Sequence, residues 1–226
     1  MKLSIIIPVF NEQNTILPIL DKIMAVVLPA NLSKEIIVVD DGSTDLTKDK
    51  LKGLLHQECL TVLFQDHNQG KGAVVMRGIQ QATGDIILIQ DADLEYNPDN
   101  YPTLIKPILG GQTNVVYGSR LKGKIKDMRV VNRWANHFSN WTLNTLYGCQ
   151  ITDVNTCFKV FRKEVLAGIK IHAKGFEFEP EITAKFLKKG YTIKEIPITT
   201  KPRDYNEGKK LNTWKDGKKA IFALLK

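Results

Sequence analysis

The sequence contains few of the residues that mark secreted or metal-cluster proteins. Its three cysteines, Cys59, Cys149 and Cys157, are widely separated and form no CxxC pair. This spacing argues against a disulfide framework or a structural zinc site and favours a reducing compartment. The four histidines show no metal-ligand spacing either. We therefore expect a cytoplasmic protein.

Long apolar runs are also lacking. The longest, at residues 3–7 and 86–89, are far too short to cross a bilayer. The first run ends at polar Asn11 and Glu12 without a cleavage-like site, so we expect no secretory leader. The chain has 226 residues, of which 43% are hydrophobic and 25% charged, and this is enough for one α/β domain with a sizeable core.

Charge is distributed unevenly along the chain. Residues 1–113 contain 9 Lys and Arg against 14 Asp and Glu, whereas residues 114–226 contain 23 against 10, which gives −5 and +13 and a net charge of +8. A basic half suits nucleic acid, an anionic membrane or a phosphorylated substrate, and a solvated surface is the plainer alternative. Because acidic residues at a binding face repel phosphates, we expect no nucleic-acid partner.

Hydrophobic patterning predicts strands that alternate with helices, which is typical of a mostly parallel sheet with right-handed crossovers. The expected strands cover residues 3–8, 35–40, 60–64, 85–90, 114–117, 158–161 and 192–198. The expected helices cover residues 11–27, 46–55, 72–83, 133–147, 180–189 and, as an amphipathic segment, 214–226. Trp134 and Trp141 lie seven residues apart, a spacing typical of one buried helix face.

The pattern Asp91-Ala92-Asp93 follows an apolar strand, and Glu95 adds a third carboxylate at the same spacing. Mg²⁺ and Mn²⁺ prefer a few carboxylate oxygens together with substrate phosphates. A plain turn is the alternative, since aspartate is common in turns. We predict that Asp91, Asp93 and Glu95 hold a divalent ion that bridges a diphosphate.

Two further segments resemble ligand loops. Asp40 and Asp41 end the second strand, where a carboxylate can accept hydrogen bonds from a base or a ribose, and an Asx turn is the alternative. Residues 68–72, Asn-Gln-Gly-Lys-Gly, precede a helix and have the composition of a phosphate cradle, although the Walker A spacing is absent. Lys71 either contacts the anion or faces solvent.

Taken in order, these motifs resemble those of family 2 glycosyltransferases. The shared segments are Pro8 to Glu12, Asp40 to Ser43, Gly70 to Gly72 and Asp91 to Asp93. In the second half, Gly118 to Arg120, Arg133, residues 153–166 and the tail around Arg203 resemble dolichyl- and polyprenyl-phosphate hexosyltransferases. The resemblance implies an α/β fold of GT-A type: a Rossmann-like, mostly parallel sheet flanked by helices, with a short antiparallel extension in the second half.

The resemblance also implies one domain over residues 1–226, with a nucleotide-sugar half at 1–113 and an acceptor half at 114–226. It implies an inverting, metal-dependent transfer of mannose or glucose from GDP-mannose or UDP-glucose to a polyprenyl phosphate, with Mg²⁺ or Mn²⁺ as cofactor. The implied catalytic residues are Asp91, Asp93, Arg120 and Arg133, and the two arginines meet the acceptor phosphate. The implied donor contacts are Pro8, Phe10, Asn11, Glu12, Asp40, Asp41, Lys71, Asp91, Ala92, Asp93, Arg203 and Lys210.

The acceptor decides whether a general base is required. A lipid phosphate is already an anionic nucleophile, whereas a sugar or other alcohol needs a carboxylate base. Glu177, Glu179 and Glu181 are candidates, and their alternative is to complement the dipole of the helix that follows. An alcohol acceptor is thus the second hypothesis, and a non-catalytic nucleotide or nucleic-acid binder is the third.

A lipid acceptor implies contact with the membrane. We expect the chain to lie peripherally at the cytoplasmic face, through the basic half and the segment 214–226, with or without a separate membrane partner. The alternative is that 214–226 forms a helix packed on the domain.

Overall fold

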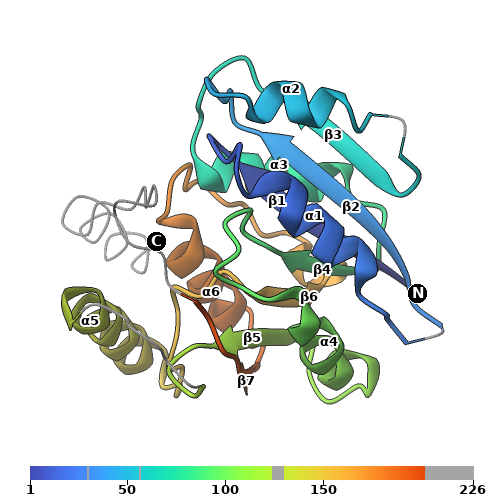
Figure 1. Cartoon of the computed structure of the whole chain (residues 1–226). Coiled ribbons are helices and arrows are strands. Elements are labelled where there is room, and N and C mark those ends of the chain that lie inside the picture. Colours follow the sequence, from blue (N-terminus) through green and yellow to red (C-terminus); the bar gives the residue numbers. More distant parts are fainter. Residues whose placement is uncertain (30, 56, 124–129, 202–226) are drawn as a thin grey trace.

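The computed structural model describes residues 1–29, 31–55, 57–123 and 130–201, without the side chains of 130–135. Seven strands form one sheet in the order β3-β2-β1-β4-β6-β5-β7 (Figure 1). They are β1 Lys2–Val9, β2 Ser33–Asp40, β3 Leu60–Phe64, β4 Ile86–Ile89, β5 Val115–Ser119, β6 Lys159–Arg162 and β7 Ile193–Pro197. The sheet combines strands from both halves of the sequence.

Strand β6 is the antiparallel member of the sheet. Strands β3, β2, β1 and β4 pair in parallel, and so do β5 and β7. β6 runs antiparallel between β4 and β5, so its first residues lie where its neighbours end. The predicted mostly parallel GT-A sheet with a short antiparallel part is confirmed, with the antiparallel strand inserted inside the sheet.

Helices flank the sheet, with α3 packed on β1 and β2, α4 on β5 and β6, and α5 against α6 (Figure 1). They are α1 Ile16–Ala25, α2 Thr47–Lys52, α3 Lys71–Gln81, α4 Tyr101–Leu109, α5 Val130–Tyr147 and α6 Phe178–Lys188, with short 3₁₀ turns at Pro98–Asn100 and Lys163–Leu166. Helix α4 was not expected from the sequence. Pro102 in its first turn and Pro107 inside it obscure the helical pattern.

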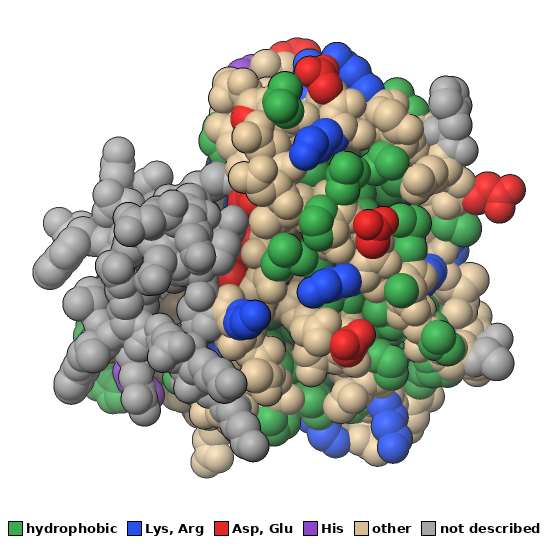
Figure 2. All heavy atoms as spheres, in the orientation of Figure 1, with side chains coloured by type: hydrophobic (Ala, Val, Ile, Leu, Met, Phe, Trp, Pro, Cys, Tyr) green, Lys and Arg blue, Asp and Glu red, His purple; other side chains and the backbone are tan. Residues whose placement is uncertain are grey.

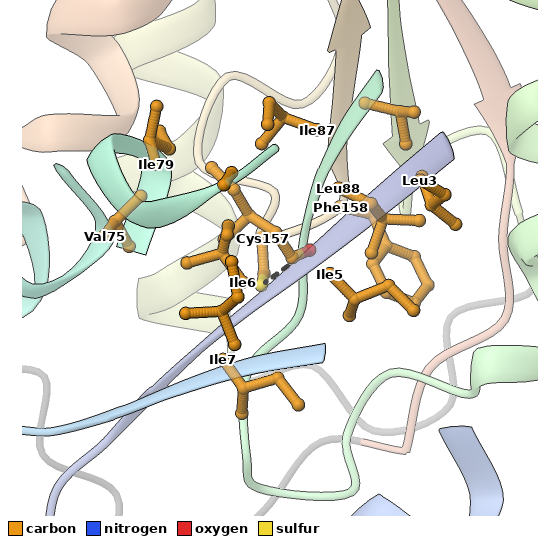
Figure 3. Close-up of a cluster of buried hydrophobic side chains, with 14 of the residues drawn as sticks. Leu3, Ile5, Ile6, Ile7, Val75, Ile79, Ile87, Leu88, Cys157 and Phe158 are labelled. Carbon is orange, nitrogen blue, oxygen red and sulfur yellow. Dashed lines mark hydrogen bonds between the residues drawn. The ribbon is translucent and has the colours of Figure 1, made fainter. Parts of the chain in front are cut away.

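The core lies between the sheet and its helices. The β1 side chains from Leu3 to Ile7 are fully buried, and they meet Val75 and Ile79 of α3 and Phe158, which precedes β6 (Figure 3). Runs that are apolar on both faces are typical of central parallel strands, and this explains the continuous Leu3 to Ile7 segment.

Helix α1 begins at Ile16 and not at Asn11 as the pattern predicted. Asn11 has a positive φ of 50° and its amide donates to Ser43 Oγ at 2.9 Å. The amide of Glu12 donates to Thr47 Oγ1 at 2.8 Å. These bonds between the segments after β1 and β2 replace the first helical turn.

Trp141 of helix α5, which was predicted to be buried, is exposed to solvent. Trp141 is 64% exposed and stacks on Phe138, whose ring centroid is 6.0 Å away. The face turned to the protein carries Asn136 and Asn140, which are both buried. The prediction that Trp141 belongs to the core was therefore wrong, because the asparagines and Leu143, which packs against Ile151, Val154 and Ala184, form the buried face of this helix.

Glu35 joins β2 to the turn between α3 and β4. Its carboxylate accepts the amides of Thr83 at 2.7 Å and Gly84 at 3.0 Å and lies 2.6 Å from Lys2 Nζ. Burial opposes the charge, but the bonds from Lys2, Ser4 and Thr83 outweigh it and lower the pKa of Glu35 from 4.5 to about 2.

We expect Glu35→Gln to lower the free energy of unfolding at pH 7. Because the folded-state pKa is depressed, this stabilisation is complete above pH 4.5 and is lost as the pH falls through about 2. Urea denaturation at several pH values checks this, with Glu58→Gln at an exposed site as the control. A difference between Glu35→Gln and the parent that stays constant down to pH 2 would contradict it.

The described helices include none long and apolar enough to cross a bilayer. On the face seen in Figure 2, Lys and Arg side chains are scattered among apolar and acidic ones and form no single basic patch in the described part.

Candidate active site

The strand register brings the predicted donor residues to one edge of the sheet. Val9 pairs with Asp40, and Ile6 pairs with Ile89, so β1, β2 and β4 end near one another. The amide of Asp41 also donates to Val9 O at 2.7 Å. The segments 10–12, 40–43 and 91–95 therefore leave the sheet at the same edge, where open α/β sheets bind ligands.

Asp40 has an unused carboxylate oxygen at this edge. The residue is fully buried, and its Oδ2 accepts the amide of Ser43 at 3.2 Å. Its Oδ1 is buried and has no hydrogen-bond partner among the described residues. A buried acceptor without a partner is costly, so this atom suits a ligand that brings a donor group.

Asp41, in contrast to Asp40, bonds to the backbone through both of its carboxylate oxygens. Its two oxygens accept the amides of Gln69 at 2.7 Å and Gly70 at 2.9 Å, so it fixes the turn before α3. Burial raises the pKa of Asp41, and the two amides oppose this. The carboxylate pair thus divides into a turn-forming Asp41 and an available Asp40.

The glycines before α3 serve backbone packing. Gly70 has a φ of 96°, and a Cβ on it would lie 2.5 Å from Lys174 O; a Cβ on Gly72 would clash with Ala173 O. The amide of Ala73 donates to Lys174 O at 3.2 Å. The close approach of the segment 173–175 accounts for both glycines, and the phosphate cradle at 68–72 stays a prediction.

Asp91, Ala92 and Asp93 form the turn after β4. Asp93 Oδ1 accepts the amide of Glu95 at 3.1 Å, and Leu94 has a φ of 61°, a conformation that is strained for leucine. Ala92 is buried, whereas Asp91 keeps 23% of its side chain exposed. The turn presents Asp91 at the edge and turns the chain sharply before Glu95.

The donor set of this turn fits a hard divalent cation, because carboxylate oxygens are the ligands that Mg²⁺ and Mn²⁺ prefer. Within the described ranges, no three His, Cys, Asp or Glu side chains group closely enough to hold a metal ion by themselves. The assignment of Asp91, Asp93 and Glu95 to a metal ion stays a prediction, and it requires oxygens from a ligand.

Lys71 connects Asp91 to Glu179 of α6. Its Nζ lies 2.7 Å from Asp91 Oδ1 and 3.0 Å from Glu179 Oε1. Burial disfavours the ammonium, but the two carboxylates outweigh it and raise the pKa of Lys71. The alternative of a solvent-facing Lys71 is wrong, because its side chain is 13% exposed and faces the acidic edge.

Glu179 is the one of the three candidate glutamates that faces this edge. Helix α6 begins at Phe178, two residues earlier than predicted, which puts Glu179 in its first turn. Glu181 instead accepts the amides of His172 and Ala173 at 2.9 and 2.6 Å, and Glu177 accepts the amide of Gly175 at 3.1 Å. Glu177 and Glu181 therefore hold the loop before α6.

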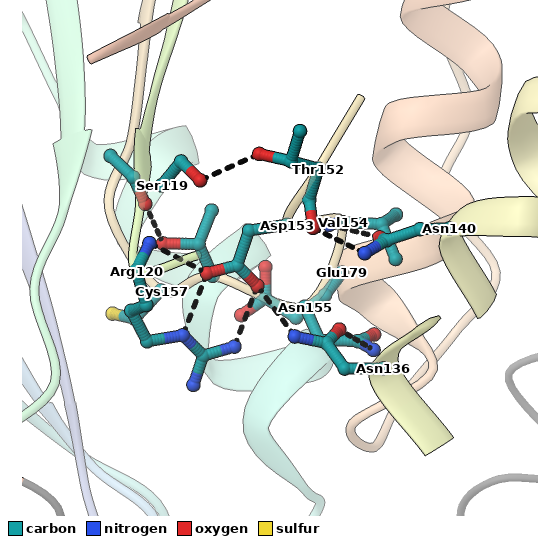
Figure 4. A network of polar contacts seen from close by, with 12 residues as sticks. Ser119, Arg120, Asn136, Asn140, Thr152, Asp153, Val154, Asn155, Cys157 and Glu179 are labelled. Carbon is teal, nitrogen blue, oxygen red and sulfur yellow. Dashed lines mark hydrogen bonds and ion pairs between the residues drawn. The ribbon is translucent and has the colours of Figure 1, made fainter. Parts of the chain in front are cut away.

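Arg120 follows β5 and binds Asp153 through two parallel bonds (Figure 4). Its Nε and Nη2 lie 2.7 Å from the two oxygens of Asp153, and its amide donates to Oδ2 at 2.9 Å. Burial disfavours both charges, but each group stabilises the other, so the pKa of Asp153 is lowered and that of Arg120 is raised. Arg120 is thus held rigidly, with 17% of its side chain exposed.

A row of asparagines on α5 supports Asp153 and the segment around it (Figure 4). Asn136 Nδ2 donates to Asp153 Oδ1 at 3.0 Å, and Asn140 Oδ1 accepts the amide of Val154 at 2.9 Å. One turn on, Asn144 bonds both backbone groups of Ile151. Sequence reasoning missed this row, although the repeat of asparagine every four residues is visible in the sequence.

Several predicted site residues lie outside what the structure describes. The backbone of Arg133 is in α5, but its side chain is outside the described residues. Arg203 and Lys210 lie beyond Lys201, the last described residue. Pro8, Phe10, Asn11 and Glu12 are described and lie at the end of β1. Their roles toward a donor stay predictions.

Two curated proteins similar to this chain have names that refer to a lipid phosphate. A dolichol-phosphate mannosyltransferase from Pyrococcus furiosus is 31% identical over 215 residues, which cover 92% of this chain and 59% of that protein. A dodecaprenyl-phosphate galacturonate synthase from Rhizobium johnstonii is 24% identical, with 92% and 62% covered. The chain spans about three fifths of the length of these two relatives.

Solved structures show the same fold. Glucosyl-3-phosphoglycerate synthase from Mycobacterium tuberculosis, in complex with Mn²⁺, UDP and phosphoglyceric acid, superimposes with a TM-score of 0.76 at 23% identity. The match covers 99% of this chain and 77% of that one. The complex of the same enzyme with Mn²⁺ and UDP-glucose gives a TM-score of 0.77 at 22% identity, with 99% and 77% covered.

The family model for glycosyl transferase family 2 matches residues 4–169. This range contains most of β1, all of β2 to β6, and the acidic turns after β2 and β4 that belong to the site described above. The chain therefore belongs to glycosyl transferase family 2.

Proposed function

We propose that this protein transfers a hexose from a nucleotide-diphosphate sugar to a polyprenyl phosphate, with inversion at the sugar carbon. The donor lies at the carboxyl edge of β1, β2 and β4, where 10–12, 40–43 and 91–95 meet. GDP-mannose and UDP-glucose are the two donors to be tested first.

The main observation in support of this proposal is the Oδ1 atom of Asp40, which has no hydrogen-bond partner among the described residues. A buried acceptor at the edge of the sheet, next to the acidic turn of Asp91 and Asp93, suits the N–H of a base or a ribose hydroxyl. The diphosphate would then extend toward Asp91 and Asp93. When bound there, Mg²⁺ or Mn²⁺ stabilises the negative charge that grows on the leaving diphosphate.

Glu179 favours a phosphate acceptor over an alcohol. Its two carboxylate oxygens lie 3.0 Å from two ammonium groups, those of Lys71 and Lys159. Both oxygens of this buried carboxylate already face an ammonium group, so neither is free to take a proton from an alcohol, and a transfer to an alcohol needs a positioned base. A lipid phosphate attacks the sugar carbon without one, and the names of the two curated relatives point to the same acceptor class.

The acceptor half would supply the cations for this phosphate. Arg120 is presented by β5 and Asp153, and Arg133 is the second predicted contact. A lipid acceptor places the protein peripherally at the cytoplasmic face of a membrane, with the segment 214–226 as a contact and with or without a separate membrane partner. Flotation with liposomes, with and without anionic lipid, tests this contact.

A thermal-shift panel of nucleotide sugars tests the donor site. Ligands that bind the folded state raise the midpoint of unfolding, so a true donor raises it in the presence of Mn²⁺ and less without it. Comparing GDP-mannose with UDP-glucose, and each with its free nucleotide, distinguishes recognition of the base from recognition of the sugar. A panel without any shift would remove the proposal.

The substitution Asp40→Asn should weaken binding of the responsive nucleotide by about tenfold or more, because a hydrogen bond to a charged group is worth roughly 1.5–3 kcal/mol. Isothermal titration with the free nucleotide measures the change. Asp66→Asn removes one charge at an exposed site and should leave the affinity unaltered. Equal affinities for Asp40→Asn and the parent would show that Asp40 does not touch the nucleotide.

A further inference from the structure

Four charged side chains form an alternating line from the core to the edge of the sheet. They are Lys159 on β6, Glu179 on α6, Lys71 on α3 and Asp91 after β4. Successive members are 3.0, 3.0 and 2.7 Å apart, measured between ammonium nitrogen and carboxylate oxygen. The exposed fraction of the side chains rises from 0% at Lys159 to 23% at Asp91.

The inner end of this line is fixed. Lys159 Nζ donates to Val154 O and Thr156 O at 2.8 Å each and lies 4.2 Å from the centre of the Tyr117 ring. Burial lowers the pKa of Lys159, and Glu179 opposes this. With its ammonium enclosed on several sides, Lys159 holds one oxygen of Glu179 in place.

Glu179 in turn holds Lys71. Its second oxygen lies 3.0 Å from Lys71 Nζ, which leaves this ammonium between a buried carboxylate and a partly exposed one. Asp91 is therefore neutralised by a lysine that stays tethered to Glu179 on its other side. A divalent cation that binds Asp91 must compete with this ammonium for the same carboxylate.

We propose that Lys71 is the resident counterion of Asp91 in the donor-free protein and yields this carboxylate to the divalent cation when the diphosphate binds. Lys71 remains paired with Glu179, close to the negative charge of the diphosphate. The inference rests on the proposed function, because it takes the diphosphate site to be at the turn of Asp91 and Asp93.

Two consequences follow for metal binding. The ion alone binds weakly, because it must displace an ammonium that is already paired with Asp91. The ion and the diphosphate bind cooperatively, because the diphosphate gives the displaced ammonium a new partner. Such coupling between two ligands is reciprocal and commonly reaches five- to 150-fold.

Electron paramagnetic resonance of free Mn²⁺ measures this directly and needs no turnover. Without nucleotide, Lys71→Met should bind Mn²⁺ about tenfold more tightly than the parent, since a competing cation is gone. In the parent, saturating GDP or UDP should increase the affinity for Mn²⁺. In Lys71→Met, the nucleotide should increase this affinity much less. Lys106→Met removes a charge from an exposed site on α4 and should match the parent in both states.

Lys71→Gln repeats the test with a neutral polar side chain, so the test does not depend on Met being tolerated. Lys71→Arg keeps the cation and should bind Mn²⁺ as weakly as the parent. Unaltered or weaker Mn²⁺ binding by both neutral variants, without nucleotide, would overturn the inference. If neither GDP nor UDP binds the parent, the proposed donor site fails, whereas the comparison with Mn²⁺ alone still decides the role of Lys71.

Discussion

Replacing Asp91 with asparagine is expected to lower the rate of sugar transfer by about a thousandfold. Asp91 is a partly exposed carboxylate of the turn after β4, and it is the residue through which both Lys71 and the proposed cation act. Loss of one group that stabilises developing negative charge commonly costs about 10²- to 10³-fold in rate, and the loss of a metal ligand adds to this.

Steady-state rates with a responsive nucleotide sugar and a short-chain polyprenyl phosphate give this measurement. Asp21→Asn, at an exposed position of α1, is the matched control and should retain the parental rate. If the rate of Asp91→Asn is within tenfold of the parental rate, another residue must stabilise the developing charge.

Asp153→Asn is expected to destabilise the protein by about 3–5 kcal/mol, which is the usual cost of breaking a buried ion pair from one side. Asp153 is fully buried and accepts two side-chain bonds from Arg120 and one from Asn136. The asparagine has the same shape, so the change isolates the lost charge. Arg120 would be left largely enclosed without its counterion.

Urea denaturation measures this effect, and the double variant Arg120→Met with Asp153→Asn gives the coupling between the two residues. The exposed pair of Lys52 and Asp49, with side chains 54% and 68% exposed, is the control, and Asp49→Asn should cost less than about 1 kcal/mol. A similarly small loss for Asp153→Asn would show that Arg120 does not depend on its partner.

The sequence was sufficient to place the acidic segments at one edge of the sheet. Parallel strands put their carboxyl ends side by side, so apolar runs followed by aspartate predicted the meeting of the Asp40 and Asp91 turns. The order of the strands and the direction of β6 depend on pairing between distant segments. Local patterns say little about such pairing.

The contacts that sequence reasoning missed join segments that are far apart in the sequence. Asp153 lies 33 residues from Arg120, and Lys159 meets Glu179 from a different element. The reason for the glycines at 70 and 72 was not visible in the sequence either, because the backbone that they accommodate lies at 173–175. A glycine pattern shows that something comes close, but not whether it is a phosphate or another part of the chain.

Helix α4 shows how proline can hide an element. Tyr101, Leu104, Ile105 and Ile108 are buried with helical spacing, as in the helices that were predicted. Pro102 is tolerated in the first turn, where an amide has no helical partner, but Pro107 breaks the pattern when it is read locally. Packing of the apolar face against β5 and β6 outweighs this cost.

The central claim is that the acidic edge binds a nucleotide-diphosphate sugar with a divalent ion for transfer to a lipid phosphate. The most direct test is incubation of the protein and Mn²⁺ or Mg²⁺ with radiolabelled GDP-mannose or UDP-glucose and a short-chain polyprenyl phosphate. We predict a radiolabelled lipid that forms only with the metal ion and is not formed by Asp91→Asn. Transfer to a sugar alcohol but not to the lipid phosphate, or equal transfer with the metal chelated, would contradict the claim.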